Sequence, residues 1–151
     1  MTLLLLRHAD AGRPGAFDGP DRQRPISEQG RAQARALVAT LAEQPLERVL
    51  ASPYQRCLET VQPLAAARGL EVEEEDALAE GAPPDLVGRL LRRLAGREVL
   101  LCTHGPVIDG VIGDLDRRGR LALPARWPTG SVWMLIGDLD APTVRYQPPP
   151  V

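Results

Sequence analysis

The chain contains two histidines, and each directly follows a short apolar run and one polar residue. His8 comes after the leucines at 3–6 and Arg7, and His104 comes after the apolar run at 99–102 and Thr103. A neutral imidazole can act as a nucleophile or a proton acceptor, and a guanidinium beside it offers paired N–H donors to an anion. The combination favours chemistry on a phosphate group, although Arg7 and His8 alone could be a surface pair at the end of a strand.

A third polar stretch, which begins at Ser52 and contains Arg56, also follows a short apolar segment. Phosphoryl transfer needs positioned reactants and stabilised charge on the equatorial oxygens, which two arginine forks can supply. A histidine nucleophile would then form a covalent intermediate without a metal ion. Taken singly, Arg56 could be a solvated helix residue and His104 a buried structural histidine, so the interpretation depends on the three stretches lying together.

Composition narrows the classes of function. With 151 residues, of which 44% are hydrophobic and 25% charged, the chain is expected to form one soluble globular domain over residues 1–151. The net charge of −2 and the isoelectric point of about 5.7 indicate no basic surface for a nucleic-acid polymer or a membrane. No apolar run approaches the length of a membrane-spanning helix, and the first residues lack the pattern of a secretion signal.

The counts of cysteine, histidine and lysine exclude several kinds of site. Cys57 and Cys102 form no metal-binding spacing, so we interpret them as core residues of a protein in the reduced cytoplasm. Two histidines are too few for a histidine-rich metal centre, and we expect neither a metal ion nor another cofactor. The 18 basic residues are all arginine, which excludes Schiff-base chemistry and a P-loop lysine.

Short apolar strands alternate with amphipathic helices along the chain, which predicts an α/β fold. The expected architecture is a three-layer sandwich with a mostly parallel central sheet and helices on both faces. The carboxyl ends of the strands in such a sheet form the edge at which ligands bind, so the three polar stretches should meet there. The predicted strands lie at 3–6, 48–51, 70–72, 98–102, 131–136 and 143–146, and the predicted helices at 28–44, 53–68, 86–94 and 107–112.

Local signals place the ends of the second helix. Ser52 is the expected N-cap and Pro53 the first helical residue, so Gln55 would complete a capping box with Ser52. Gly69 is expected to end this helix, and Pro63 predicts a kink or a break within it.

Residues 11–25 are rich in glycine, proline and charge, which predicts a long loop after the first strand. Loops of this length in a compact domain are usually functional or disordered, and we interpret this one as a flap beside the site. Arg22 and Arg24 within the flap could reach an anionic part of a substrate, or they could be solvated loop charges.

Three short motifs resemble, in this order, the signature of the histidine phosphatase superfamily, also called phosphoglycerate-mutase-like proteins. They are Arg7-His8-Ala9, Ser52-Pro53 with Arg56 and Glu59-Thr60, and Thr103-His104-Gly105. Each motif is weak alone, but together they span nearly the whole chain. The compact length, and the Arg24-Pro25 pair ahead of the first helix, are similar to the short branch that contains the protein-phosphohistidine phosphatases. The chain also resembles the phosphatase domain of some Nudix hydrolases.

The resemblance implies a role for four of these side chains. His8 would be the nucleophile that becomes a phosphohistidine, with its other ring nitrogen held by a partner such as a backbone carbonyl. Arg7, Arg56 and His104 would hold the phosphate oxygens, and His104 would contribute most as a cation. Ala9 departs from the family pattern, in which glycine is common, and its methyl group should slightly narrow the approach to the phosphate.

The leaving oxygen needs a proton, which a carboxyl group in a crowded, partly dry site can carry near neutral pH. Glu80 is the expected general acid, because residues 78–81 resemble the acid-bearing loop of the family. Asp10 and Asp21 are its rivals. Glu80 could instead be a solvated carboxylate that continues the acidic stretch at 73–76.

The resemblance implies a metal-independent phosphatase that hydrolyses a phosphate monoester or phosphoramidate. The expected substrate is a phosphohistidine protein, and the alternative is a nucleotide phosphate or another small phosphorylated metabolite. Little chain is available between Arg56 and Glu80 to build an enclosing lid, which favours hydrolysis over the transfer that phosphoglycerate mutases catalyse. A non-catalytic phosphate-binding module is a further alternative, although it would not need His8. We expect a monomer or a weak dimer.

Overall fold

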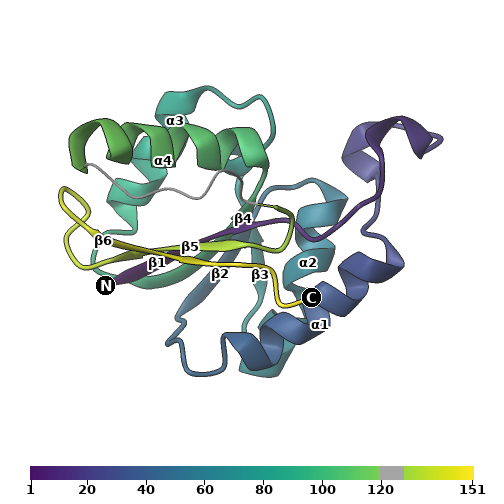
Figure 1. Ribbon diagram of the computed structural model, residues 1–151, viewed down its shortest axis with the longest axis horizontal. Helices are drawn as coiled ribbons and strands as arrows, with labels where there is room; N and C mark the ends of the chain where they lie inside the picture. The colour runs from purple at the N-terminus through teal and green to yellow at the C-terminus, as the bar shows by residue number, and fades with distance from the viewer. Residues whose placement is uncertain (120–127) are drawn as a thin grey trace.

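The structure is a computed structural model that describes residues 1–119 and 128–151 (Figure 1). The described residues form a six-stranded sheet and four α-helices. The strands are β1 (Thr2–Arg7), β2 (Arg48–Ala51), β3 (Val72–Glu74), β4 (Glu98–Thr103), β5 (Val132–Ile136) and β6 (Thr143–Gln147). The helices are α1 (Glu28–Thr40), α2 (Gln55–Arg68), α3 (Pro84–Arg93) and α4 (Gly105–Gly119), with single 3-10 turns η1 (Pro14–Ala16), η2 (Asp21–Gln23) and η3 (Asp76–Leu78).

The sheet has the strand order β3-β2-β4-β1-β5-β6. β3, β2, β4 and β1 run parallel, whereas β5 pairs antiparallel with β1 and β6 pairs antiparallel with β5. The short connection between β5 and β6 accounts for their orientation, because a parallel pair needs a long crossover. Figure 1 shows α3 and α4 over one face of the sheet and α1 and α2 over the other. The predicted three-layer α/β sandwich is therefore confirmed, with a mixed sheet.

β1 lies inside the sheet and is buried on both faces. Leu3 and Leu5 pack in one apolar cluster with side chains of α3 and α4, and Leu4 and Leu6 pack in another with side chains of α1 and α2. All four leucines are 0% exposed. Burial at successive positions explains why the apolar run is continuous rather than alternating. It also fixes the end of the strand, where the first histidine follows.

The register of the sheet brings the three predicted polar stretches to one edge. Arg7 of β1 lies opposite Thr103 of β4, and Ala51 of β2 lies opposite Cys102 of β4. The pairing continues one residue beyond β1, where the His8 N–H donates to the Thr103 carbonyl at 3.0 Å. The expectation that these stretches meet at the carboxyl ends of parallel strands is confirmed.

The predicted start of the second helix is wrong. α2 begins at Gln55, and its N-cap is Tyr54, whose side chain makes no capping bond. The Ser52 N–H donates to the Cys102 carbonyl at 3.0 Å instead of to the Gln55 side chain, so no capping box forms. The Ser52 side chain is instead buried and bonded to His104, a partner far away in the sequence that the local pattern cannot indicate.

Other boundaries differ by a few residues. α2 continues through Pro63 without a break and ends at Gly69, whose φ of 66° is the left-handed conformation that favours glycine. α1 ends at Thr40, four residues before the predicted end at 44. β3 lies at 72–74 rather than 70–72, because pairing with β2 takes up the first acidic residues of the run at 73–76.

The turn after β1 packs tightly against the start of α1. The Ser27 hydroxyl accepts a hydrogen bond from the Gly30 N–H at 3.0 Å, and it also bonds to the carbonyl and the carboxylate of Asp10. A Cβ atom on Gly30 would overlap the Asp10 carbonyl oxygen, so this close approach requires glycine. The Asp10 carboxylate is thereby held at the start of α1.

Candidate active site

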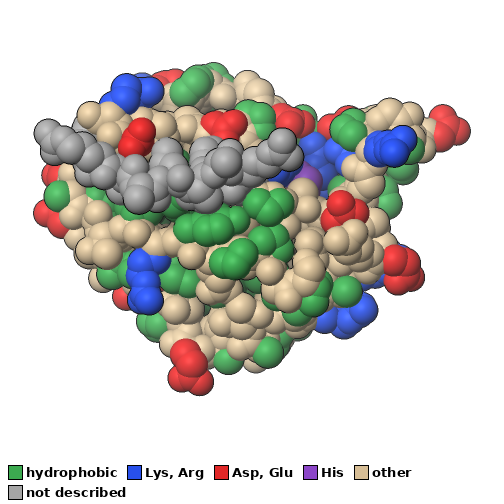
Figure 2. All heavy atoms as spheres, in the orientation of Figure 1, with side chains coloured by type: hydrophobic (Ala, Val, Ile, Leu, Met, Phe, Trp, Pro, Cys, Tyr) green, Lys and Arg blue, Asp and Glu red, His purple; other side chains and the backbone are tan. Residues whose placement is uncertain are grey.

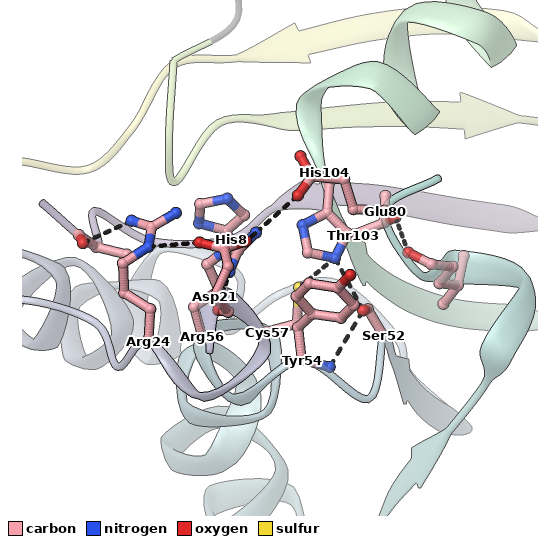
Figure 3. Close-up of polar contacts among 12 residues, drawn as sticks. His8, Asp21, Arg24, Ser52, Tyr54, Arg56, Cys57, Glu80, Thr103 and His104 are labelled. Carbon is pink, nitrogen blue, oxygen red and sulfur yellow. Dashed lines mark hydrogen bonds and ion pairs between the residues drawn. The ribbon is translucent and has the colours of Figure 1, made fainter. Parts of the chain in front are cut away.

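Side chains from separate strand ends and loops meet at the carboxyl edge of the sheet (Figure 3). The rings of His8 and His104 lie edge to face, with centroids 5.5 Å apart. Arg56 contributes its guanidinium from the first turn of α2, and the side chains of His104 and Arg56 are almost completely buried. The Arg7 guanidinium lies against the start of α4, because a Cβ atom on Gly105 would stand 3.5 Å from its Cζ. The structure thus brings together the four residues proposed to contact phosphate.

His8 is held in one tautomer by the backbone. Its Nδ1 lies 2.8 Å from the Ala9 carbonyl oxygen. A carbonyl can only accept a hydrogen bond, so Nδ1 carries the proton and Nε2 has a free electron pair. This is the backbone contact expected from the sequence for the second ring nitrogen of a histidine nucleophile.

Both histidines are neutral at neutral pH. Burial, the largest influence, lowers the pKa of His8 to about 4; the bond to Ala9 opposes this effect, and the neighbouring arginines add to it. Burial, followed by the nearby His8 and Arg56, lowers the pKa of His104 to about 3. His8 is therefore in the neutral form that a histidine nucleophile requires, and His104 is not the cation considered from the sequence.

Arg56 contacts two carboxylates at the site. Its Nη1 donates to the Asp21 carbonyl at 2.9 Å, and its Nη2 donates to the carboxylates of Asp21 and Glu80 at 3.1 Å and 3.0 Å. Nε of Arg56 is buried and has no partner among the described residues. Both Glu80 and its rival Asp21 therefore lie at the site, whereas Asp10 is held at the start of α1.

The Asp21 carboxyl is stabilised as an anion. Desolvation raises its pKa, but the hydrogen bond from Arg24 and the charges of Arg24 and Arg56 outweigh that effect, so the pKa of Asp21 lies below its ordinary value. A carboxylate held in this way is a poor proton donor near neutral pH. Asp21 is therefore the weaker candidate for the general acid, and Glu80, which pairs with Arg56 but not with Arg24, remains the expected one.

The two arginines of the flap lie in different environments. Arg24 is buried, and its guanidinium donates to the Asp21 carboxylate at 3.0 Å and the Ala11 carbonyl at 2.7 Å. It therefore anchors the flap to the turn after β1. Arg22 is exposed, with its guanidinium 5.4 Å from the centre of the Tyr54 ring, and it is the better placed of the two to meet a substrate. Figure 2 shows arginine and histidine side chains in the hollow between the flap and the rest of the molecule.

Three further side chains contact the site histidines or the backbone beside them. Tyr54, for which the sequence indicated no role, has its ring centroid 4.8 Å from that of His104. Thr60 accepts a hydrogen bond from the Ala9 N–H at 2.9 Å and so secures the backbone beside His8. Cys57 is buried in the core as expected, yet its Sγ is also 3.7 Å from Nε2 of His104. The family motif contained Thr60; the other contacts could not be inferred from local patterns.

Elsewhere, the parts of the chain that the structure describes offer little for this chemistry. Within residues 1–119 and 128–151, no three His, Cys, Asp or Glu side chains lie close enough to hold a metal ion. A cavity of about 510 Å³ lies between α3 and α4, but neither His8 nor His104 lines it. None of the described helices combines the length and the apolar character that crossing a membrane requires.

The depressed histidine pKa values predict that stability falls in mild acid. In the unfolded chain the histidines take up protons near their ordinary pKa of 6.5, whereas in the folded protein they do so only near 4 and 3. The folded state therefore binds fewer protons in this interval, and its stability decreases as the pH falls from 6.5 towards 4. The expected loss is on the order of 1–2 kcal/mol per histidine down to about pH 5.

Urea denaturation at a series of pH values measures this dependence. A His8→Gln/His104→Gln double variant is the control, and its free energy of unfolding should change less steeply between pH 6.5 and about 5. An unchanged slope in the double variant would contradict the assignment of two neutral, buried imidazoles.

Comparison with known proteins identifies a phosphatase family and relatives that are named as phosphatases. The model of the histidine phosphatase superfamily (branch 1) matches residues 3–89. The 8-oxo-(d)GTP phosphatase of Mycolicibacterium smegmatis is 34% identical over 99% of this chain and 48% of its own length. The phosphohistidine phosphatase SixA homolog of Haemophilus influenzae is 26% identical over 76% of this chain and 77% of its own. The chain spans about half or less of the length of the first curated relatives it matches.

The fold also matches solved structures. The protein histidine phosphatase SixA complexed with tungstate superposes with a TM-score of 0.83 at 24% identity, covering 99% of this chain and 97% of that one. A mycobacterial glucosyl-3-phosphoglycerate phosphatase superposes with a TM-score of 0.74 at 19% identity, covering 96% of each chain. At these identities the likeness establishes a common fold, while the substrates named for those proteins remain theirs.

Proposed function

This chain belongs to the histidine phosphatase superfamily (branch 1), and on that premise we propose that it hydrolyses a terminal phosphate through a phosphohistidine on His8. The observation that carries the proposal is the orientation of His8. Its Nδ1 is occupied by the Ala9 carbonyl, so the free electron pair lies on Nε2, in a site where Arg56 and His104 each have a buried nitrogen without a partner among the described residues. A nucleophile and donors for an oxyanion therefore share one site.

The first step of the proposed reaction forms the N–P bond. The electron pair on Nε2 of His8 attacks phosphorus in line, and the bond from phosphorus to the leaving oxygen breaks. Arg7, Arg56 and His104 donate hydrogen bonds to the equatorial oxygens, where negative charge is concentrated. Glu80 supplies the proton that the leaving oxygen takes up, and becomes a carboxylate.

The second step regenerates the enzyme. Water attacks phosphorus and loses a proton to the Glu80 carboxylate, and the N–P bond breaks. Inorganic phosphate leaves, and His8 is again neutral with its electron pair on Nε2. Because Asp21 and Glu80 both contact Arg56, a bound phosphate competes with these carboxylates for Nη2 while gaining Nε.

A nucleotide phosphate is the first substrate class we propose. Its support is the relative named 8-oxo-(d)GTP phosphatase, whose similarity extends over almost all of this chain. A phosphohistidine protein is the second, supported by the similarity to the SixA homolog of Haemophilus influenzae. Exposed Arg22 at the mouth of the site could bind further phosphates of a nucleotide or acidic groups beside a phosphohistidine, so it serves either class.

A substrate panel tests the proposal. The purified protein is assayed with an aryl phosphate, nucleoside mono-, di- and triphosphates, a phosphosugar and a protein carrying phosphohistidine, each with and without a chelator. We expect release of inorganic phosphate that the chelator does not affect, and a preferred class with kcat/KM at least about 100-fold above the aryl phosphate, worth roughly 3 kcal/mol of differential binding.

The alternatives give different results in the same assay. Binding of orthovanadate without turnover of any compound would indicate a phosphate-binding module and overturn the proposal. Transfer of the phosphoryl group within a phosphosugar, without net release of phosphate, would indicate a mutase. Loss of activity with the chelator would contradict a reaction that depends on arginine and histidine alone.

A further inference from the structure

Ser52 bonds to one of the two site histidines from the end of β2. Its Oγ lies 2.8 Å from Nε2 of His104, and its side chain is 0% exposed (Figure 3). The same oxygen accepts a hydrogen bond from the Tyr54 N–H at 3.3 Å. The sequence suggested a helix cap for Ser52, but α2 begins three residues later, so the hydroxyl is not needed there.

The direction of the Ser52–His104 bond follows from the partners of the hydroxyl. A serine hydroxyl has one proton to donate. Among the described residues the Ser52 oxygen bonds to Nε2 of His104 and to the Tyr54 N–H, and of these two groups only the ring nitrogen can accept a proton. If Nε2 carried a proton, Oγ would receive two donors and its own proton would be buried without an acceptor, which costs about 1–3 kcal/mol. The hydroxyl therefore donates to Nε2, and the proton of the neutral imidazole lies on Nδ1.

The surroundings of the two ring nitrogens support this assignment. Near Nε2 lie two groups that can donate, the Ser52 hydroxyl and the Cys57 thiol, whose Sγ is 3.7 Å away. Nδ1 is buried and has no partner among the described residues. The His104 carbonyl accepts from the Val107 and Ile108 N–H groups, so the ring stands at the positive end of α4, where the neutral form is favoured and an anion is attracted.

The two histidines are thus protonated on the same nitrogen and present opposite ends to the site. The Nδ1–H of His8 is used by the Ala9 carbonyl, which leaves Nε2 as the nucleophile. On His104 it is Nε2 that is bound, by Ser52, which leaves Nδ1–H as a donor. With the pKa of His104 at about 3, this donor depends on the tautomer and not on a second proton.

We infer that Ser52 is a positioning residue, which holds His104 as the neutral Nδ1–H tautomer so that this imidazole donates a hydrogen bond to phosphate. The catalytic consequence rests on the proposed function, whereas the tautomer is a property of the protein itself. Without the hydroxyl, His104 is free to adopt the Nε2–H form, which turns a lone pair towards the phosphate oxygens and repels them.

The tautomer is measured directly by proton–nitrogen correlation spectra of protein with isotope-labelled histidine. The chain has two histidines, and a His8→Gln variant assigns the spectrum. We expect His104 to show a protonated Nδ1 and an unprotonated Nε2 in the wild type, and a large population of the Nε2–H form in Ser52→Ala. A wild-type proton on Nε2 would overturn the inference, even if Ser52→Ala failed to fold.

Affinity and turnover complete the test. In Ser52→Ala we expect inorganic phosphate to bind about tenfold more weakly and kcat to fall by about 10- to 100-fold, whereas Ser52→Thr, which keeps the hydroxyl, should restore the Nδ1–H tautomer. The matched control is Ser131→Ala, because Ser131 is also a buried serine but its Oγ has no partner among the described residues. It should leave the tautomer and the affinity unchanged.

Two outcomes separate this inference from the proposed function. A Ser52→Ala protein that keeps the Nδ1–H tautomer and wild-type phosphate affinity would refute the inference, whatever the enzyme's activity. A wild type that shows the expected tautomer, with phosphate binding sensitive to Ser52→Ala but no turnover of any phosphate, would support the inference and refute the proposed function.

Discussion

Replacement of His8 by alanine is expected to reduce kcat for an aryl phosphate by about 10⁴-fold or more, because loss of a covalent nucleophile removes the reaction path itself. The second imidazole, His104, is not placed to replace it, because its Nε2 is bonded to Ser52 and we infer that its Nδ1 carries the proton. Steady-state release of inorganic phosphate measures the effect, and circular dichroism verifies that the variant is folded.

Phosphate binding supplies the control for this variant. His8→Ala leaves Arg56 and His104 in place, so its affinity for inorganic phosphate should stay within about tenfold of wild type, or roughly 1.4 kcal/mol. Retention of both binding and normal turnover by His8→Ala would exclude His8 as the nucleophile.

The Arg56→Lys variant is expected to lower kcat/KM by about 100- to 1,000-fold, because lysine keeps the charge but loses the planar fork and its Nε donor. The Arg56 side chain is 1% exposed and donates to both Asp21 and Glu80. A lysine has fewer donors in a fixed geometry, so it should also hold these two carboxylates less firmly. The ratio of kcat/KM between variant and wild type measures this loss.

Arg48→Lys is the matched control for that substitution. Arg48 also forms a two-bond contact, with Glu73 at 2.7 Å and 3.0 Å, but the pair is on the surface and far from the site in the sheet. A surface pair of this kind contributes little, so the control should keep wild-type activity. Equal effects of the two substitutions would mean that Arg56 does not bind the reacting phosphate.

The sequence was most informative where burial is continuous. The leucines at 3–6 predicted a strand covered on both faces, and the structure places them in two apolar clusters on opposite sides of the sheet. Because parallel strands end at one edge, the positions of His8 and His104 could be predicted once each was placed after such a strand. The resemblance to a known family then supplied roles that the residue types alone left open.

Long-range hydrogen bonds were the part that local patterns could not predict. Ser52 has the surroundings of a helix cap in the sequence, yet its hydroxyl is hydrogen-bonded to the imidazole of His104, 52 residues away. The sequence leaves Arg24, like Arg22, as either a substrate contact or a solvated loop charge, but the fold buries it against Asp21. In each case a polar side chain is satisfied by a partner that only the tertiary structure brings within reach.

The most direct test of the central claim is to trap the phosphoryl enzyme. The protein is mixed with a radiolabelled aryl phosphate, stopped in alkali within milliseconds of mixing, and digested. The account predicts label on the peptide that contains His8, stable in alkali and lost in acid, and no label in the His8→Ala variant. Normal turnover in which the protein carries no label at any time point would contradict the account, as would label on an acid-stable residue.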